Sequence, residues 1–119
     1  MSTNVFWLLA LNVKEGKSEE LKKLMGEMVD ATNKNEPDTL NYEWFLSDDG
    51  KICHLYERYK DSAAMLTHLK NFGENFAERF MGCLEPTGFT VYGNPDAGVK
   101  EALAAFSPVF LPPSAGFIR

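Results

Sequence analysis

Apolar residues recur along the chain at two different spacings, and these spacings predict the secondary structure. In residues 5–13 they occupy both alternating faces, with Val5, Trp7 and Leu9 on one face and Phe6 and Leu8 on the other. Such a run is typical of a strand that is buried on both sides.

The segment between this strand and Pro37 has helical spacing instead. Ser18 is placed to cap the first turn, and Pro37 lies beyond the helix end. The apolar positions follow the i, i+3, i+4, i+7, i+8 pattern of a stripe that faces a core: Leu21, Leu24, Met25, Met28 and Val29.

Two strand-like runs follow, TLNYEWFLS and KICHLYERYK, and the Asp-Asp-Gly between them is a hairpin signal. Asp61 then caps a second helical region at residues 62–84, which we expect to break at Gly73. A last strand is expected at residues 88–93. The order β-α-β-β-α-β predicts an α+β, ferredoxin-like domain over residues 1–95, with one antiparallel sheet and helices on one face.

The remaining residues, 96–119, predict a short helix from Asp96 and an extended tail. Pro108, Pro112 and Pro113 argue against regular strand pairing in this tail, because proline has no N–H to donate. We expect the segment to pack on the domain or on a dimer partner.

Composition narrows the class of protein. A chain of 119 residues has room for one domain, and its net charge of -5 with no basic cluster argues against nucleic acid or a membrane as partner. The apolar N-terminal run lacks the basic start and the cleavage site of a signal peptide. With Cys53 and Cys83 as its two cysteines, the chain is expected to be cytoplasmic, with reduced thiols.

The predicted sheet has one face that no helix covers, yet the first strand is apolar on both faces. Trp44, Phe45 and Tyr56 add further large side chains to the middle strands. Soluble monomers rarely expose so broad an apolar surface, so a homodimer with sheet packed against sheet is expected.

These features together resemble the antibiotic biosynthesis monooxygenase family. The resemblance rests on NVKEGK after the first strand, NYEWFLSDDG before the hairpin turn, and YERYKDSAAMLTHL at the junction of strand and helix. It implies a dimeric α+β barrel. It also implies a range of activities, including cofactor-free oxidation of quinols and aromatic polyketides, haem degradation, and isomerisation of a signal molecule.

Two departures from the family narrow that range. Haem-degrading relatives use an Asn on the first strand, where this chain has Leu9, and a Trp in the second helical region, where residues 62–84 have none. Some quinol-oxidising relatives carry a second His, at a place occupied here by Gly73 or Glu74. No cofactor is expected, and the haem interpretation is disfavoured.

His68 and Glu57 are the residues with the strongest claim to chemistry. His68 lies three residues after Met65 and four before Phe72, so it shares the buried face of its helix. It is either a catalytic base at a pocket or a core-edge histidine bonded to a backbone carbonyl. Glu57 points into an apolar layer, as a structural ion-pair partner or a second catalytic group.

Candidate substrate-binding residues are Asn12, Trp44, Tyr56 and Phe72. Aromatic side chains offer stacking surfaces, and Asn12 at the end of the first strand is placed either to orient a carbonyl or to begin the turn. No metal site is expected, because His54 and Glu57 leave their strand on opposite faces and His68 has no ligand at suitable spacing.

Two functions follow as hypotheses. The first is a cofactor-independent monooxygenase that oxidises a small quinol or phenolic substrate with dioxygen. The second is a non-oxidative dimer of the same fold that binds or isomerises a small molecule. A pocket that reaches His68 favours the first, and a filled core with Glu57 in an ion pair favours the second.

Overall fold

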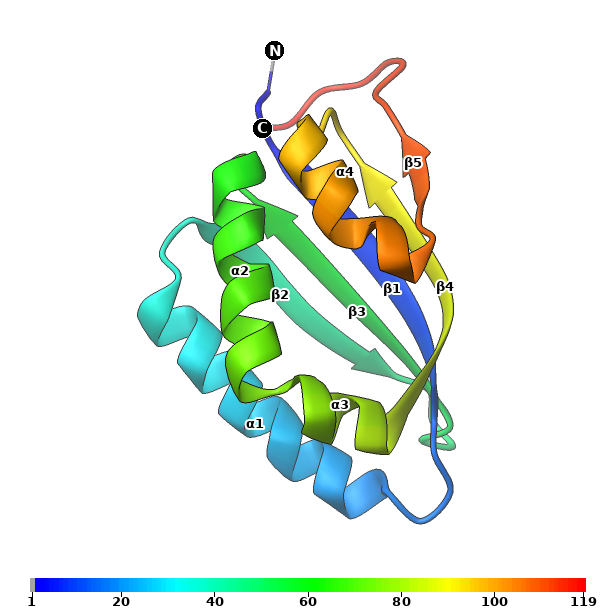
Figure 1. Ribbon diagram of the computed structural model, residues 1–119. Coiled ribbons are helices and arrows are strands. Elements are labelled where there is room, and N and C mark those ends of the chain that lie inside the picture. Colours follow the sequence, from blue (N-terminus) through cyan, green and yellow to red (C-terminus); the bar gives the residue numbers. More distant parts are fainter. Residues whose placement is uncertain (1) are drawn as a thin grey trace.

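The computed structural model describes residues 2–119, whose five strands form one sheet in the order β2-β3-β1-β4-β5. The strands are β1 (Val5–Val13), β2 (Thr39–Leu46), β3 (Ile52–Tyr59), β4 (Leu84–Tyr92) and β5 (Val109–Leu111). The helices are α1 (Ser18–Asn35), α2 (Ser62–Asn75), α3 (Ala77–Cys83) and α4 (Ala97–Leu103). All four helices lie on one face of the sheet (Figure 1). The predicted α+β, ferredoxin-like fold is confirmed.

Strand β1 is the centre of the sheet and pairs antiparallel with both β3 and β4. Its alternation matches the predicted pattern. Val5, Trp7 and Leu11 are buried under the helices, while Phe6 and Leu8 are half-buried on the opposite, open face.

The long helix α1 buries Leu21, Leu24 and Met28 against the sheet, as the stripe predicted. Val29, predicted to share that stripe, is instead 38% exposed. The predicted cap is wrong by one residue. Ser18 is the first helical residue, and Lys17 before it provides no side-chain hydrogen bond. The start of α1 therefore depends on packing and on Glu19 and Glu20 in its first turn.

At α2 the predicted cap is confirmed, since the Asp61 carboxylate accepts a hydrogen bond from the Ala64 amide at 2.9 Å. The helix continues through Gly73 and breaks at Phe76, three residues later than predicted. A single glycine only weakens a helix by about 1 kcal/mol, and the packing of Phe72 on Phe80 favours the later break.

The C-terminal part of the sheet differs from the prediction. Strand β4 begins at Leu84 rather than residue 88, and the register of its pairing with β1 shifts near Pro86, which has no N–H for the ladder. Contrary to the prediction from the tail prolines, β5 pairs parallel with β4. The three residues of β5 lie between Pro108 and Pro112, and an edge strand needs partners on one side only.

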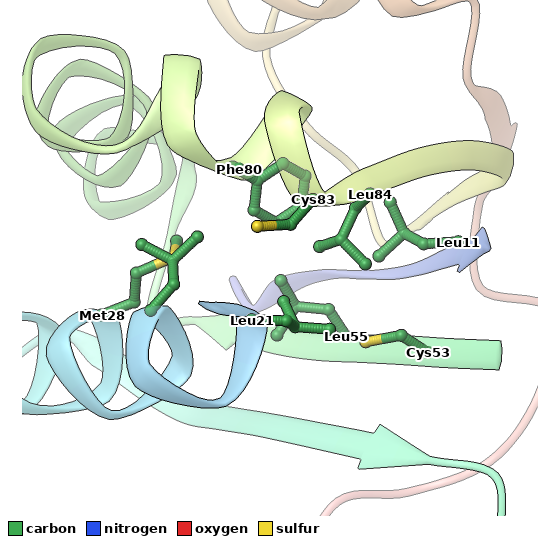
Figure 2. Close-up of a cluster of buried hydrophobic side chains, with 9 residues drawn as sticks. Leu11, Leu21, Met28, Cys53, Leu55, Phe80, Cys83 and Leu84 are labelled. Atoms are coloured by element: carbon green, nitrogen blue, oxygen red, sulfur yellow. The ribbon is translucent and has the colours of Figure 1, made fainter. Parts of the chain in front are cut away.

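The core consists of two clusters on the helical face of the sheet. The first lies under α1 and α3 and contains both cysteines, which are buried and unbonded (Figure 2). The second lies under α2 and α4, where Val99 and Leu103 pack with Trp7 and Met65. The segment after residue 95 therefore contributes directly to the core.

Candidate functional site

A cavity of about 280 Å³ lies on the helical face of the sheet, where the two core clusters meet. Strands β1–β4, all four helices and the short 3-10 helix Ala104–Phe106 contribute to its wall. The apolar lining residues are Trp7, Leu9, Met28, Leu55, Leu69, Phe72, Phe80, Met81, Pro86, Phe89, Leu103 and Phe106. Tyr42, Glu57 and His68 complete the wall. Phe106 and Met81, both substantially exposed, mark its mouth.

Glu57 projects from the middle of β3 towards the helices and is 2% exposed. Its Oε2 accepts a hydrogen bond from Trp7 Nε1 at 2.7 Å. Its Oε1 accepts one from the Tyr59 hydroxyl and contacts His68 Nε2 at 2.9 Å. Three donors thus hold one buried carboxylate, as a buried charge requires.

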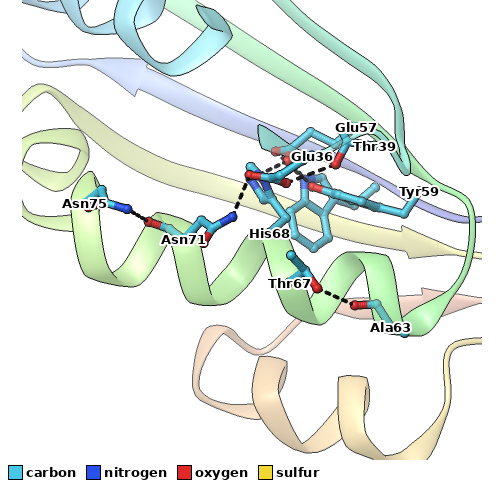
Figure 3. Close-up of polar contacts among 10 residues, drawn as sticks. Glu36, Thr39, Glu57, Tyr59, Ala63, Thr67, His68, Asn71 and Asn75 are labelled. Atoms are coloured by element: carbon cyan, nitrogen blue, oxygen red, sulfur yellow. Dashed lines mark hydrogen bonds and ion pairs between the residues drawn. The ribbon is translucent and has the colours of Figure 1, made fainter. Parts of the chain in front are cut away.

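A second carboxylate reaches the same histidine from the end of α1. Glu36 is the residue that ends this helix, and its Oε1 lies 2.8 Å from His68 Nδ1 (Figure 3). The Thr39 hydroxyl also donates to Oε1, at 3.0 Å, and Asn71 Nδ2 donates to Oε2, at 3.3 Å. The imidazole is therefore held between two buried carboxylates.

This arrangement determines the charge of His68. Because both ring nitrogens face carboxylate oxygens, both act as donors, which requires the protonated ring. Burial alone would lower the pKa of His68, but the charges and hydrogen bonds of Glu57 and Glu36 outweigh it and raise the pKa to about 10. Burial likewise opposes ionisation of Glu36, and the hydrogen bond and charge of His68 keep its pKa below the usual value. The three groups together carry one net negative charge.

Two buried donors beside this network have no hydrogen-bond partner among residues 2–119. They are the Tyr42 hydroxyl and Trp44 Nε1, on neighbouring positions of the same face of β2. Burial and the charge of Glu57 raise the pKa of Tyr42 above its ordinary value, so this hydroxyl stays protonated. The unsatisfied polar groups of the region are therefore neutral donors.

The structure brings together only some of the predicted site residues. His68, Glu57 and Phe72 line the cavity. Trp44 lies on the same face of the sheet but packs behind the cavity wall, against Tyr42 and Phe80. Tyr56 is on the open face against Phe6, and Asn12 is exposed at the end of β1, so neither lines the cavity.

The structure combines features of both alternatives for His68 and Glu57, but His68 is bound by two carboxylates rather than by a backbone carbonyl. A cavity reaches His68, and Glu57 is also its ion-pair partner. Glu36 was not predicted from the sequence, because it lies 32 positions before His68 and shares no local spacing with it. The only signal for Glu36 was its position: a carboxylate directly before Pro37, between the predicted end of the first helix and the strand that follows.

Within the described residues, no group of three His, Cys, Asp or Glu side chains is arranged to hold a metal ion. No helix in residues 2–119 has the length and apolar character needed to cross a membrane.

Comparison with known proteins agrees with this fold. The family model described as antibiotic biosynthesis monooxygenase matches residues 5–80. MupZ from Pseudomonas fluorescens superposes with a TM-score of 0.88 and 23% identity, covering 100% of this chain and 91% of MupZ. No curated protein sequence matches the chain significantly.

Two further solved structures cover less of the chain. SnoaB from Streptomyces nogalater, described as a cofactor-independent oxygenase, has a TM-score of 0.66 and 11% identity, with coverage of 81% of this chain and 97% of SnoaB. A conserved protein from Methanosarcina mazei Go1 has a TM-score of 0.65 and 21% identity, with coverage of 76% and 91%. At these identities the structural matches establish the fold.

One mixed sheet covered on one face by helices, with a largely apolar cavity between them, defines the protein as an α+β domain of ferredoxin-like fold. The chain belongs to the antibiotic biosynthesis monooxygenase family, since the family model covers more than half of its length.

Proposed function

We propose that the protein is a cofactor-independent monooxygenase that oxidises a small quinol or phenolic substrate with dioxygen. The observation that carries this proposal is an apolar cavity whose wall includes one charged network, Glu57 and His68. Apolar walls exclude water and strengthen electrostatic interactions with a bound substrate. Family membership and the cofactor-independent oxygenase activity named for SnoaB support the same class of reaction.

In this proposal Glu57 accepts the substrate proton. His68 was the base expected from the sequence, but both of its nitrogens are occupied as donors. A carboxylate has about four hydrogen-bond acceptor positions. Donors occupy three of these positions on Glu57, and one remains free. The free position makes Glu57 the better acceptor, and His68 acts as the cation beside it.

The reaction balances without an external reductant. Glu57 takes a proton from the substrate, and the substrate anion passes one electron to dioxygen, which gives a substrate radical and superoxide. The radicals combine at a carbon that carries hydrogen, and the peroxide anion recovers the proton from Glu57. Loss of water from the hydroperoxide then leaves a carbonyl, with one oxygen atom in the product and one in water.

A non-oxidative binding or isomerising function is the second candidate. The observation that favours it is that the network offers proton transfer alone: Glu57 can take a proton from one substrate atom and return it to another. Such a protein would convert or retain its ligand without consuming dioxygen.

We further propose that the protein is a homodimer that pairs through the open face of the sheet. This face presents Phe6, Leu8 and Tyr56, together with the more exposed Phe45 and Ile52, which are 52% and 50% exposed. Burying this surface against a second copy would remove it from water, and a twofold axis would place the same residues on both sides.

Oxygen uptake tests the oxygenase directly. The purified protein is supplied with a panel of quinols and with anthrone, and uptake is compared in wild type, Glu57→Gln, His68→Ala and His54→Ala. We expect uptake above autoxidation in wild type and His54→Ala, and a fall of about 100-fold or more in Glu57→Gln, the usual range for loss of an acid–base group. His54 is the matched control, since it lies on the open face.

Wild-type uptake no faster than autoxidation across the panel would contradict the oxygenase and favour the non-oxidative candidate. Undiminished uptake in a folded Glu57→Gln variant would remove Glu57 from the mechanism.

A further inference from the structure

Glu36 differs from Glu57 in one respect that bears on its role. Both carboxylates are buried, at 7% and 2% exposure, and both contact His68. Glu57 lines the cavity, but Glu36 does not. A ligand in the cavity can therefore exchange a proton with Glu57, whereas Glu36 reaches the ligand only through the imidazole ring.

Glu36 is also fixed more firmly than a side chain at a helix end usually is. Its backbone amide donates to Thr32 of α1, and its carboxylate accepts from Thr39, Asn71 and His68. These contacts join the end of α1 to the start of β2 and to the middle of α2. The carboxylate is held at one position relative to His68 Nδ1, at 2.8 Å.

This geometry matters when Glu57 takes up a proton. A neutral Glu57 no longer compensates the charge of His68, whose ring is almost completely buried. A buried imidazolium without a counter-charge would lose its proton. The second carboxylate, still charged and still bound to Nδ1, prevents that loss.

We propose that Glu36 is a positioning residue that keeps His68 a cation after Glu57 has become protonated. The imidazolium then remains in the cavity wall while negative charge develops on the substrate and on reduced dioxygen. A fixed cation beside developing negative charge stabilises the transition state. The consequence for catalysis rests on the proposed function, whereas the protonation of His68 does not depend on any substrate.

The test uses Glu57→Gln as a stable mimic of protonated Glu57. In protein labelled with ¹⁵N-histidine, NMR distinguishes an imidazolium, with two N–H groups, from a neutral ring. We expect His68 in Glu57→Gln to remain an imidazolium at pH 7.5. In the Glu36→Gln, Glu57→Gln double variant we expect the ring to be neutral at that pH. His54 provides an internal reference in every spectrum.

A neutral His68 in folded Glu57→Gln at pH 7.5 would overturn the proposal, and so would an imidazolium in the folded double variant. If either variant fails to fold, Glu36→Gln alone decides the matter. We expect it to lower the pKa of His68 by at least one unit, and an unchanged pKa would overturn the proposal. Glu43→Gln is the matched control, because this carboxylate is exposed on the open face and should leave His68 unchanged.

Oxygen uptake separates this inference from the proposed function. The expected protonation states together with no uptake in wild type would retain the role of Glu36 towards His68 and refute the oxygenase. Oxygen uptake by wild type, together with a neutral His68 in Glu57→Gln, would support the oxygenase and refute the role of Glu36.

Discussion

The charge assigned to His68 has a thermodynamic consequence that can be measured on the unmodified protein. The pKa of His68 is raised from 6.5 to about 10 in the folded state, so folding binds its proton more tightly. For a group with a raised folded pKa, the stabilisation is fully present below the unfolded pKa. It is lost as the pH rises through the folded pKa. Stability should therefore fall steadily from pH 7 towards pH 10.

The slope follows from the number of protons released on unfolding. Where the folded state keeps the His68 proton and the unfolded state has lost it, the free energy of unfolding falls by about 1.4 kcal/mol per pH unit. Between pH 7.0 and pH 8.5 the expected decrease is about 2 kcal/mol, a large share of the stability of a small domain. The thiols of Cys53 and Cys83, whose pKa values burial raises, add to the decrease mainly above about pH 8.5, where the thiols of the unfolded chain are mostly ionised.

Urea unfolding at half-unit pH steps from 7.0 to 8.5 measures this slope. All titrations use one protein concentration, because the stability of a dimer depends on concentration. The His54→Gln variant is the matched control and should show the same slope, since the other histidine lies on the open face. A free energy of unfolding that stays constant over this range would refute the assignment of a buried imidazolium. If the slope disappears in His54→Gln, the pH dependence comes from His54, and its assignment to His68 is wrong.

Two other predictions concern the fold and the assembly. Asp61→Ala removes the side-chain cap that accepts a hydrogen bond from the Ala64 amide, so the free energy of unfolding in urea should fall by about 1 kcal/mol. The control is Asp48→Ala in the exposed hairpin, which should change this free energy by less than half as much. Phe45→Glu places a charge on the open face and should convert the dimer to a monomer in light scattering, whereas Val29→Glu on α1 should leave the dimer intact. A wild-type monomer would contradict the proposed assembly.

The fold could be predicted because its main elements carry local signals. Alternation in residues 5–13, helical spacing after Ser18 and the cap at Asp61 each depend on residues close together in the sequence. The order of these elements then limits the possible sheet arrangements. Strand β5 carries no such signal, because three residues between prolines are too few to show a period.

The candidate site was predictable only in part, for a physical reason. His68 and Glu57 could be placed on buried faces from their neighbours, but their partners come from other elements. Glu36 and His68 are joined by the docking of a helix end against the middle of another helix. Nothing in the spacing of residues along the chain encodes that distance. The difference between a free base and a doubly bound imidazolium therefore becomes apparent only in three dimensions.

The position of the cavity wall along the chain has a consequence for biosynthesis. Leu103 and Phe106, which close one side of the cavity, belong to the last fifth of the chain, and β5 covers the edge of β4 only after them. A ribosome makes the protein from its N-terminus, so strands β1–β4 and the first three helices emerge before these residues. Until these residues emerge, the nascent chain exposes an open apolar cavity and an unpaired edge of β4. Binding of a ligand, and protection of this surface from other chains, are therefore expected only once the C-terminal segment has left the ribosome.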